Sequence, residues 1–190
     1  MTTSSTIELP PELSSQRTVL VPLTFARAEL IYRYYQENLQ HLFQWDSEPD
    51  ANAYSLEVWQ AYAEWSQQQY ENGQQLEFIA LDKEKNEMLA LCSFTAMTKA
   101  PTYSCDIGFS IALKHQGQGL MFEVLQRLIA YLFDEKKMHR IVARYHPDNQ
   151  RSQSLLETLC FEREGRAKAY LKINAVWCDH IVMALINPKF

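Results

Sequence analysis

Apolar residues recur at helical spacing in several segments of the chain. The first two segments are residues 25–43 and the stretch after Ser55, which Asn72-Gly73 ends. A further helix is expected to begin at residue 120, and a shorter one is expected over 151–159. The helix from residue 120 has an apolar inner face of Met121, Val124, Leu125, Leu128, Ile129 and Leu132.

Segments of strand character alternate with these helices. β-branched and aromatic residues mark strands at 17–23, 76–82, 88–97, 103–113 and 139–146, and the chain ends in a strand-rich region closing with 180–186. The polar turn KEKNE between 76–82 and 88–97 favours a hairpin. No internal repeat or interior linker interrupts the pattern. It therefore predicts a single mixed α/β domain over 17–190, preceded by a flexible polar tail at 1–16.

Composition adds that the chain is an ordinary globular protein of 190 residues with 47% hydrophobic residues. No apolar run approaches the roughly 18 residues that span a bilayer. The N-terminus lacks the cationic head and apolar stretch of a secretory signal. Cysteines at 92, 105, 160 and 178 form no CxxC pair, which favours reduced thiols and no metal site. We therefore expect a cytoplasmic protein that does not bind membranes.

The formal charge of −5 argues against nucleic acid as a direct partner. The charge is uneven, because residues 134–172 hold nine Lys/Arg and six Asp/Glu, a local +3, which leaves −8 for the remainder. One region could accept an anion while another attracts a cation. A solvated surface with chance clustering remains the alternative.

Two of the five glycines, Gly117 and Gly119, stand one residue apart between an expected strand and an expected helix. The N–H groups at a helix start have no helical partners and favour an anion such as phosphate. A loop that only needs positive φ would also place glycines here. The segment is neither a GxxxxGK[ST] phosphate loop nor a dinucleotide fingerprint, since it lacks the third glycine.

The stretch QGQGLM at 116–121 resembles the Q/R-x-x-G-x-G/A signature of the GNAT family of N-acetyltransferases, although Met121 departs from the usual small residue. Other separated blocks are also similar. The run HRIVARYHPDNQRSQSLLETLCFEREG resembles the strand, the Asn-x-x-Ser helix start and the LGF turn of the family's ribosomal-protein branch. The runs YYQENLQHLFQWD and AKAYLKINAVWCDHIVMAL look most like RimJ-type ribosomal-protein-alanine acetyltransferases within the RimJ/RimL group.

This resemblance implies a fold and a reaction. The fold would be a mixed, mostly antiparallel central sheet flanked by helices. The enzyme would use acetyl-CoA, without a metal, and an amine would attack the thioester directly. The acceptor would be the N-terminal α-amine of a ribosomal protein, with alanine as the acetylated residue, and the enzyme would be a monomer or a homodimer. Two alternatives stay open: acetylation of a small amine or antibiotic, and a non-catalytic acyl-CoA-binding or ribosome-assembly module.

The resemblance also implies which residues would bind acetyl-CoA. The strand end Phe109, Ser110 and Ile111 would offer backbone hydrogen bonds to the pantetheine arm. Asn149 would contact the same arm, and Ser152 would hydrogen-bond the sulfur or relay a proton to the thiolate; a helix-capping serine is the alternative. The pyrophosphate would be bound at the signature segment, whose residues are Gln116, Gly117, Gln118, Gly119, Leu120, Met121 and Phe122.

Two departures bear on catalysis. Many relatives carry a tyrosine acid seven residues after the Asn, where this chain has Leu156, and Cys160 replaces the glycine of LGF. The first departure shifts the role of acid to Ser152 or water. For the general base, Asp106 lies where relatives often carry an acidic residue, acting through water. A solvated strand residue is the alternative.

Candidate acceptor-binding residues lie in two regions. Glu37, with Asp46 and Glu48 near Trp45, could face a cationic peptide N-terminus. Tyr170 and Trp177 fall in the late strand region and could line the same groove, although aromatic residues are more often part of a core. The histidines at 41, 115, 139, 146 and 180 show no metal spacing.

Overall fold

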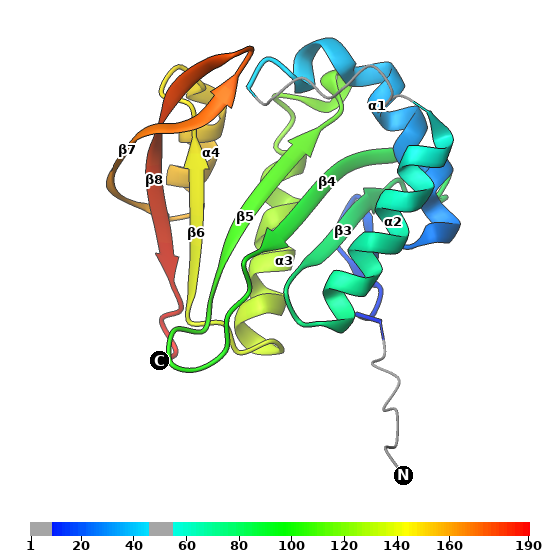
Figure 1. The fold of residues 1–190 in the computed structure, drawn as a ribbon. Coiled ribbons are helices and arrows are strands. Elements are labelled where there is room, and N and C mark those ends of the chain that lie inside the picture. Colours follow the sequence, from blue (N-terminus) through cyan, green and yellow to red (C-terminus); the bar gives the residue numbers. More distant parts are fainter. Residues whose placement is uncertain (1–8, 46–54) are drawn as a thin grey trace.

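The computed structural model describes residues 9–45 and 55–190. In these residues the chain forms one sheet in the order β1-β2-β3-β4-β5-β6-β8-β7, with helices packed on it (Figure 1). The α-helices are α1 (Ala28–Leu42), α2 (Leu56–Glu71), α3 (Leu120–Asp134) and α4 (Gln150–Thr158). The strands are β1 (Leu13–Ser14), β2 (Val19–Pro22), β3 (Leu76–Leu81), β4 (Met88–Thr95), β5 (Ser104–Ile111), β6 (Arg140–Tyr145), β7 (Glu162–Ile173) and β8 (Val176–Ile186).

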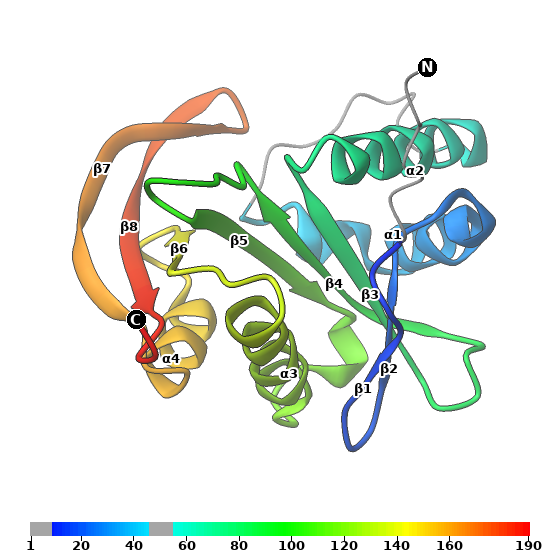
Figure 2. The same ribbon diagram turned by 90° about the horizontal axis from the view of Figure 1, so that it is seen from below.

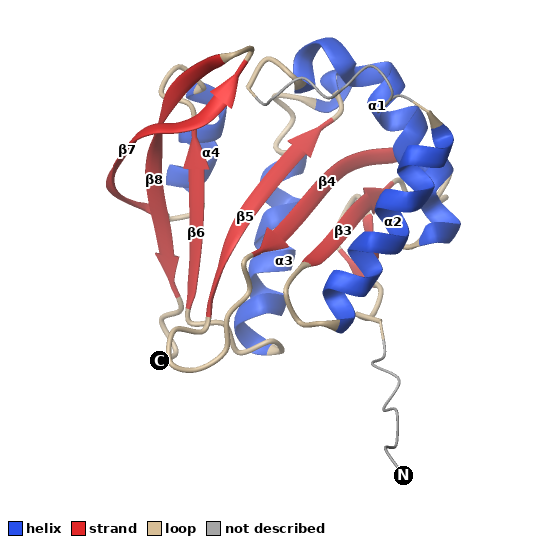
Figure 3. Cartoon of the chain, in the orientation of Figure 1, coloured by secondary structure: helices blue, strands red, loops and turns tan. Residues whose placement is uncertain are grey.

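The sheet is mixed and mostly antiparallel, as predicted. All neighbouring strands run antiparallel except β5 and β6, which are parallel. Helices α3 and α4 lie on one face of the sheet and α1 and α2 on the other (Figure 2). The secondary structure alternates along the chain as the hydrophobic pattern indicated (Figure 3).

The apolar face of α3 forms part of the larger of two hydrophobic clusters in the core. All six residues of its predicted inner face are buried, and they pack against β3, β4, β5 and β6. A second cluster joins α1 and α2 to the opposite face, with Ile31, Tyr34 and Ala63 among its members. Burial of these side chains is the main favourable term that holds the two helical layers to the sheet.

The parallel pair β5 and β6 separates part-way along its length. Their pairing runs from Ser104 opposite Arg140 to Ile107 opposite Ala143. Beyond Ile107, β5 continues to Ile111 against β4, and β6 continues to Tyr145 against β8. The two strands diverge toward these ends (Figure 1), so the sheet opens between them.

Part of the segment expected as an N-terminal tail is ordered. Leu13 and Ser14 pair with Leu20 and Val19, and Leu13 is buried in the larger cluster. The strand β1 therefore extends the sheet at its β2 edge. At the other edge, the strand-rich end of the chain is a hairpin of β7 and β8.

Candidate active site

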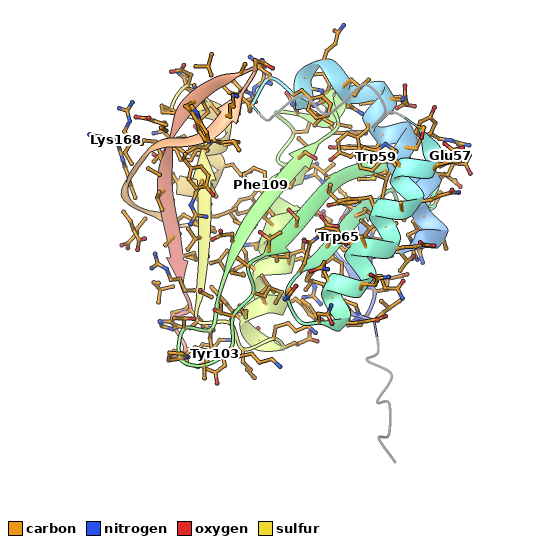
Figure 4. All side chains as sticks on the ribbon, in the orientation of Figure 1. Glu57, Trp59, Trp65, Tyr103, Phe109 and Lys168 are labelled. Atoms are coloured by element: carbon orange, nitrogen blue, oxygen red, sulfur yellow. The ribbon has the colours of Figure 1, made fainter. Side chains whose placement is uncertain are left out.

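A cavity of about 890 Å³ lies where β5 and β6 diverge. Its lining comes from both faces of the sheet: the glycine segment and the start of α4 on one side, and the end of α1 and the β7–β8 hairpin on the other. Phe109, at the β5 edge of the opening, lines the cavity (Figure 4). The cavity therefore passes through the sheet and joins its two faces.

Gly117 and Gly119 give the glycine segment its shape. Both have φ of +71°, and Gly119 is the N-cap of α3 in the left-handed conformation. A Cβ at Gly117 would meet nothing within 4 Å, and one at Gly119 would meet only the Arg17 Nη2 atom at 4.0 Å. The protein itself therefore leaves room at both glycines, and the backbone conformation is what requires them.

The segment also presents positive potential. No side chain caps the start of α3, so the N–H groups of its first turn lack helical partners. Two arginines flank the segment: Arg17 donates from Nη1 to the Gln118 carbonyl at 3.0 Å, and Arg151 donates to the Gln116 side chain. The partial charge of the helix start and the Arg151 guanidinium favour a phosphate group here, whereas the charge of Arg17 is offset by its ion pair with Glu123 at 2.7 Å. Sequence reasoning missed both arginines, because they lie 101 and 35 residues from their partners.

The end of β5 pairs with β4 along one edge and is held by α1. The Tyr34 hydroxyl and the Ser110 hydroxyl are 2.8 Å apart, and the His41 Nε2 atom lies 2.9 Å from the Ile111 carbonyl oxygen. Asn38 accepts from the Leu113 N–H at 2.8 Å. Burial raises the pKa of Tyr34, so its hydroxyl stays protonated. Helix α1 thus fixes the strand end that was predicted to contact the pantetheine arm.

Asn149 and Ser152 lie together at the start of α4. Asn149 is the N-cap, and its Oδ1 atom accepts from the Ser152 N–H at 3.1 Å. The capping task is therefore performed by Asn149, whereas Ser152 lines the cavity. Leu156 is buried in the core. Cys160 keeps φ of +65°, so the turn that ends α4 forms without the usual glycine.

Asp106 and Arg144 form an ion pair in the cavity wall. Arg144 Nη1 donates to Asp106 Oδ2 at 2.6 Å, from the adjacent strands β6 and β5. The Arg144 guanidinium also lies 5.2 Å from the centre of the Tyr170 ring, a cation–π arrangement. Asp106, which the sequence suggested as a base, therefore has a charged partner that sequence reasoning did not foresee.

Two histidines continue this wall. The His180 ring lies 5.2 Å from Tyr170 and 6.1 Å from His146, and His146 lies 5.5 Å from Trp45. All of these residues line the cavity. Neither histidine was predicted to contribute. The signal was present in the sequence, because His146 stands three residues before Asn149, where the Asn-x-x-Ser helix start begins, but its meaning depended on the distant pairing of β6 with β8.

The other candidate residues are placed differently. Glu37 is exposed on α1 and lies outside the cavity lining, and Trp177 is 62% exposed on β8. Asp46 and Glu48 lie outside the described residues. Within the described ranges, no group of three or more His, Cys, Asp or Glu side chains could hold a metal ion. No helix of the described chain is both long and apolar enough to cross a membrane.

Comparison with known proteins identifies the family. The acetyltransferase (GNAT) domain matches residues 17–162. The [ribosomal protein uS5]-alanine N-acetyltransferase of Escherichia coli is 37% identical over 157 residues, covering 83% of this chain and 81% of the relative. The probable N-acetyltransferase YjcK of Bacillus subtilis is 32% identical over 122 residues, covering 64% and 67%.

Solved structures agree. The ribosomal-protein-S5-alanine acetyltransferase of Vibrio fischeri superposes with a TM-score of 0.89 at 27% identity, covering 94% of this chain and 98% of that one. A RimJ of Mycobacterium smegmatis in complex with CoA-disulfide gives 0.88 at 22% identity, covering 95% and 90%. The predicted resemblance and fold are thus confirmed, and the chain belongs to the GNAT acetyltransferase family and is an N-acetyltransferase.

Proposed function

We propose that this protein transfers the acetyl group of acetyl-CoA to the N-terminal α-amine of a ribosomal protein that begins with alanine. The observation that carries the proposal is the cavity through the sheet. On one face it begins at the uncapped start of α3, which suits a phosphate group, and on the other face it is walled by polar and aromatic residues such as Arg144 and Tyr170. The relatives named for acetylating alanine of a ribosomal protein support the acceptor. A ribosomal substrate would be met in the cytoplasm.

Acetyl-CoA would enter from the face that carries α3 and α4. The backbone N–H groups from Gly117 to Phe122 would bind its pyrophosphate, with Arg17 and Arg151 nearby. The open edge of β5 at Phe109, Ser110 and Ile111 offers peptide groups to the amides of the pantetheine arm. The fit rests on the room at both glycines and on the separation of β5 from β6.

The acceptor would enter from the opposite face, beside Trp45 and Tyr170. An α-amine has a pKa of about 7.7–8.0, so roughly a tenth of it or more is neutral at pH 7 and able to attack a thioester. Holding the amine against the thioester supplies much of the rate. Ser152 lies in the cavity lining at the start of α4, where it would donate a proton to the departing thiolate.

Thiol release from acetyl-CoA tests the proposal. Peptides led by alanine, by serine and by N-blocked alanine should be compared with the same enzyme. We expect strong release with alanine, weaker release with serine and none with the blocked peptide, because only a free α-amine can attack.

The alternatives predict other outcomes. Release with polyamines or aminoglycosides but not with peptides would assign the enzyme to small amines. Tight acetyl-CoA binding without release for any amine would indicate a binding module. Either result contradicts the proposed acceptor.

A further inference from the structure

We propose that Arg17 is a positioning residue for the acetyl-CoA site, because it fixes the orientation of one peptide group in the glycine segment, residues 116–122. The role rests on the proposed function, since it concerns the pyrophosphate that the N–H groups of this segment would bind. Arg17 lies in the connection between β1 and β2, outside the cavity lining. Its Nη1 atom donates to the Gln118 carbonyl at 3.0 Å, so it acts on the segment from the side away from the cavity.

The hydrogen bond from Arg17 also determines where the next N–H group points. The peptide bond between Gln118 and Gly119 is trans, so its carbonyl and its N–H group point in opposite directions. Because the carbonyl is turned toward Arg17, the Gly119 N–H is turned away from it. Gly119 lines the cavity, whereas neither Gln118 nor Arg17 does. This N–H group is thus directed toward the side on which the pyrophosphate would bind.

The glycine at position 119 makes such a constraint necessary. Rotation of the peptide group between Gln118 and Gly119 changes φ of Gly119, and glycine adopts positive and negative φ about equally well. The observed φ is +71°. The rotated peptide group would direct the Gln118 carbonyl oxygen at the phosphate in place of an N–H group, and the two would repel each other. The bond from Arg17 therefore favours the orientation that binds an anion.

Glu123 holds Arg17 in the position from which it reaches Gln118. The carboxylate of Glu123 accepts from the Arg17 backbone N–H at 2.6 Å and from the Arg17 Nε atom at 2.7 Å. The Ser15 hydroxyl donates to the same carboxylate at 2.5 Å, and it accepts from the Thr18 N–H at 3.1 Å. The backbone and the Nε atom of Arg17 are therefore fixed on α3, which leaves the Nη1 atom at the Gln118 carbonyl.

A purely electrostatic role of Arg17 is the alternative. Glu123 lies in the first turn of α3, so its negative charge would oppose an anion at the start of the helix. The ion pair with Arg17 offsets this charge. Removal of the arginine would therefore weaken phosphate binding under either explanation, and the test must separate orientation from charge.

Three variants separate the two explanations: Arg17→Ala, Arg17→Lys, and Arg17→Ala combined with Glu123→Gln. Lysine keeps the positive charge but lacks the planar fork that bonds Glu123 and Gln118 together. The double variant removes both charges, so no unpaired carboxylate remains. If Arg17 orients the peptide group, the Kd for CoA should rise about tenfold in all three, as expected for the loss of one hydrogen bond to a charged group. If charge alone mattered, Arg17→Lys and the double variant would bind CoA as tightly as the wild type.

Isotopic nitrogen labelling of the glycines observes the peptide group directly by NMR, because the chain has only five glycines. In the wild type, CoA should move the Gly119 amide signal and leave that of Gly73, which lies outside the cavity lining, unchanged. In Arg17→Lys, the Gly119 signal should be displaced or broadened even without CoA, because the peptide group is no longer held in one orientation. A general loss of stability would not single out this amide.

Glu12→Ala is the matched control. Glu12 pairs with Lys85 at 2.7 Å, so it also fastens the start of β1, but at the turn between β3 and β4 and not at the glycine segment. Its Kd for CoA and its Gly119 signal should equal those of the wild type. Melting temperatures are measured for all variants, and CoA binding is compared well below the lowest of them, so that unfolding is not mistaken for weak binding.

Wild-type affinity for CoA in Arg17→Lys, or restored affinity in the double variant, would overturn the proposal. A wild-type Gly119 signal that CoA leaves unchanged would overturn it together with the proposed pyrophosphate site. The proposed acceptor can fail separately, because CoA binding is measured without it. A wild type that acetylates no peptide but gives the expected CoA results would contradict the acceptor and support the role of Arg17.

Discussion

At the scale of single residues, Gly117 and Gly119 resolve a question that the sequence left open. The sequence allowed either a close ligand or a backbone that needs positive φ. Both glycines have φ of +71°, so the conformational requirement is met at each of them. The room beside them is compatible with a ligand role in the same geometry, which stays a prediction.

The substitution Gly119→Ala distinguishes the backbone requirement for positive φ from the proposed role in binding phosphate. We expect a loss of about 1 kcal/mol in the free energy of unfolding, because an L-residue is strained in the left-handed region. We also expect weaker acetyl-CoA binding, by tenfold or more, since the methyl group lies where the pyrophosphate would approach. Chemical denaturation and equilibrium binding check the two effects.

Gly73→Ala is the matched control. Gly73 also has positive φ, +70°, and no atom lies within 4 Å of its added Cβ, but it is outside the cavity lining. The control should lose similar stability and keep its affinity for acetyl-CoA. Equal affinity in both variants would remove the phosphate role from Gly119.

Cys160 stands where the family pattern has a glycine, but its backbone keeps the left-handed conformation that the glycine would adopt. Its φ of +65° keeps the turn, and the Phe161 N–H still bonds the Leu156 carbonyl at 2.9 Å. The sequence could not reveal this, because the strain of a non-glycine residue in this region is offset by surrounding contacts.

At the scale of helices and strands, the elements predicted best are those whose hydrophobic pattern lies within one continuous segment of the sequence. Helix α3 has its apolar face as predicted, since the spacing of apolar residues follows directly from helical geometry. The separation of β5 from β6 could not be read from the sequence, because it depends on pairing between strands about 36 residues apart in the chain. The cavity wall of Arg144, Tyr170 and His180 was missed for the same reason.

Contacts between α1 and β5 make a prediction at this scale. Asn38 is buried, donates to the Tyr34 carbonyl at 2.8 Å and accepts from the Leu113 N–H at 2.8 Å. Asn38→Ala leaves these groups without their partner and should cost about 1–3 kcal/mol of stability. The KM for acetyl-CoA should also rise, because the end of β5 is less firmly held.

Gln40→Ala is the comparison for Asn38→Ala. Gln40 is exposed on the same helix and its substitution should change neither stability nor KM appreciably. Steady-state kinetics and thermal unfolding distinguish the two variants. If Asn38→Ala lowered stability but left the KM for acetyl-CoA unchanged, α1 would have no part in positioning β5 for the substrate.

At the scale of the whole molecule, Ser15 and Arg17 are joined to α3 across more than a hundred positions of the chain. Glu123 accepts from the Ser15 hydroxyl at 2.5 Å and from the Arg17 N–H at 2.6 Å, and it pairs with the Arg17 guanidinium at 2.7 Å. Burial alone would raise the pKa of Glu123, but these hydrogen bonds and the Arg17 charge outweigh it and the pKa is lowered.

Because the pKa of Glu123 is lowered in the folded protein, its contribution to the free energy of unfolding depends on pH. The stabilisation is present above the unfolded pKa of about 4.3 and is lost as the pH falls through the lower folded value. Glu123→Gln should therefore lose about 1–3 kcal/mol at pH 7. The difference from the wild type should shrink as the pH is lowered toward 3, which denaturation at several pH values will measure.

Gln67→Ala provides a surface comparison, because its bond to Glu71 joins neighbours on one helix. Its stability should differ little from that of the wild type at either pH. A Glu123→Gln difference that stayed constant from pH 7 to pH 3 would show that the carboxylate charge does not stabilise the junction.

The opening of the sheet between β5 and β6 also bears on inhibition. Because the cavity is lined from both faces, a small molecule bound at one mouth would compete with one substrate and leave the other free to bind. A molecule long enough to pass through the gap would compete with both. Joining an alanine-led peptide to CoA through a short linker would produce such a molecule, with both parts already held at the distance that the sheet imposes.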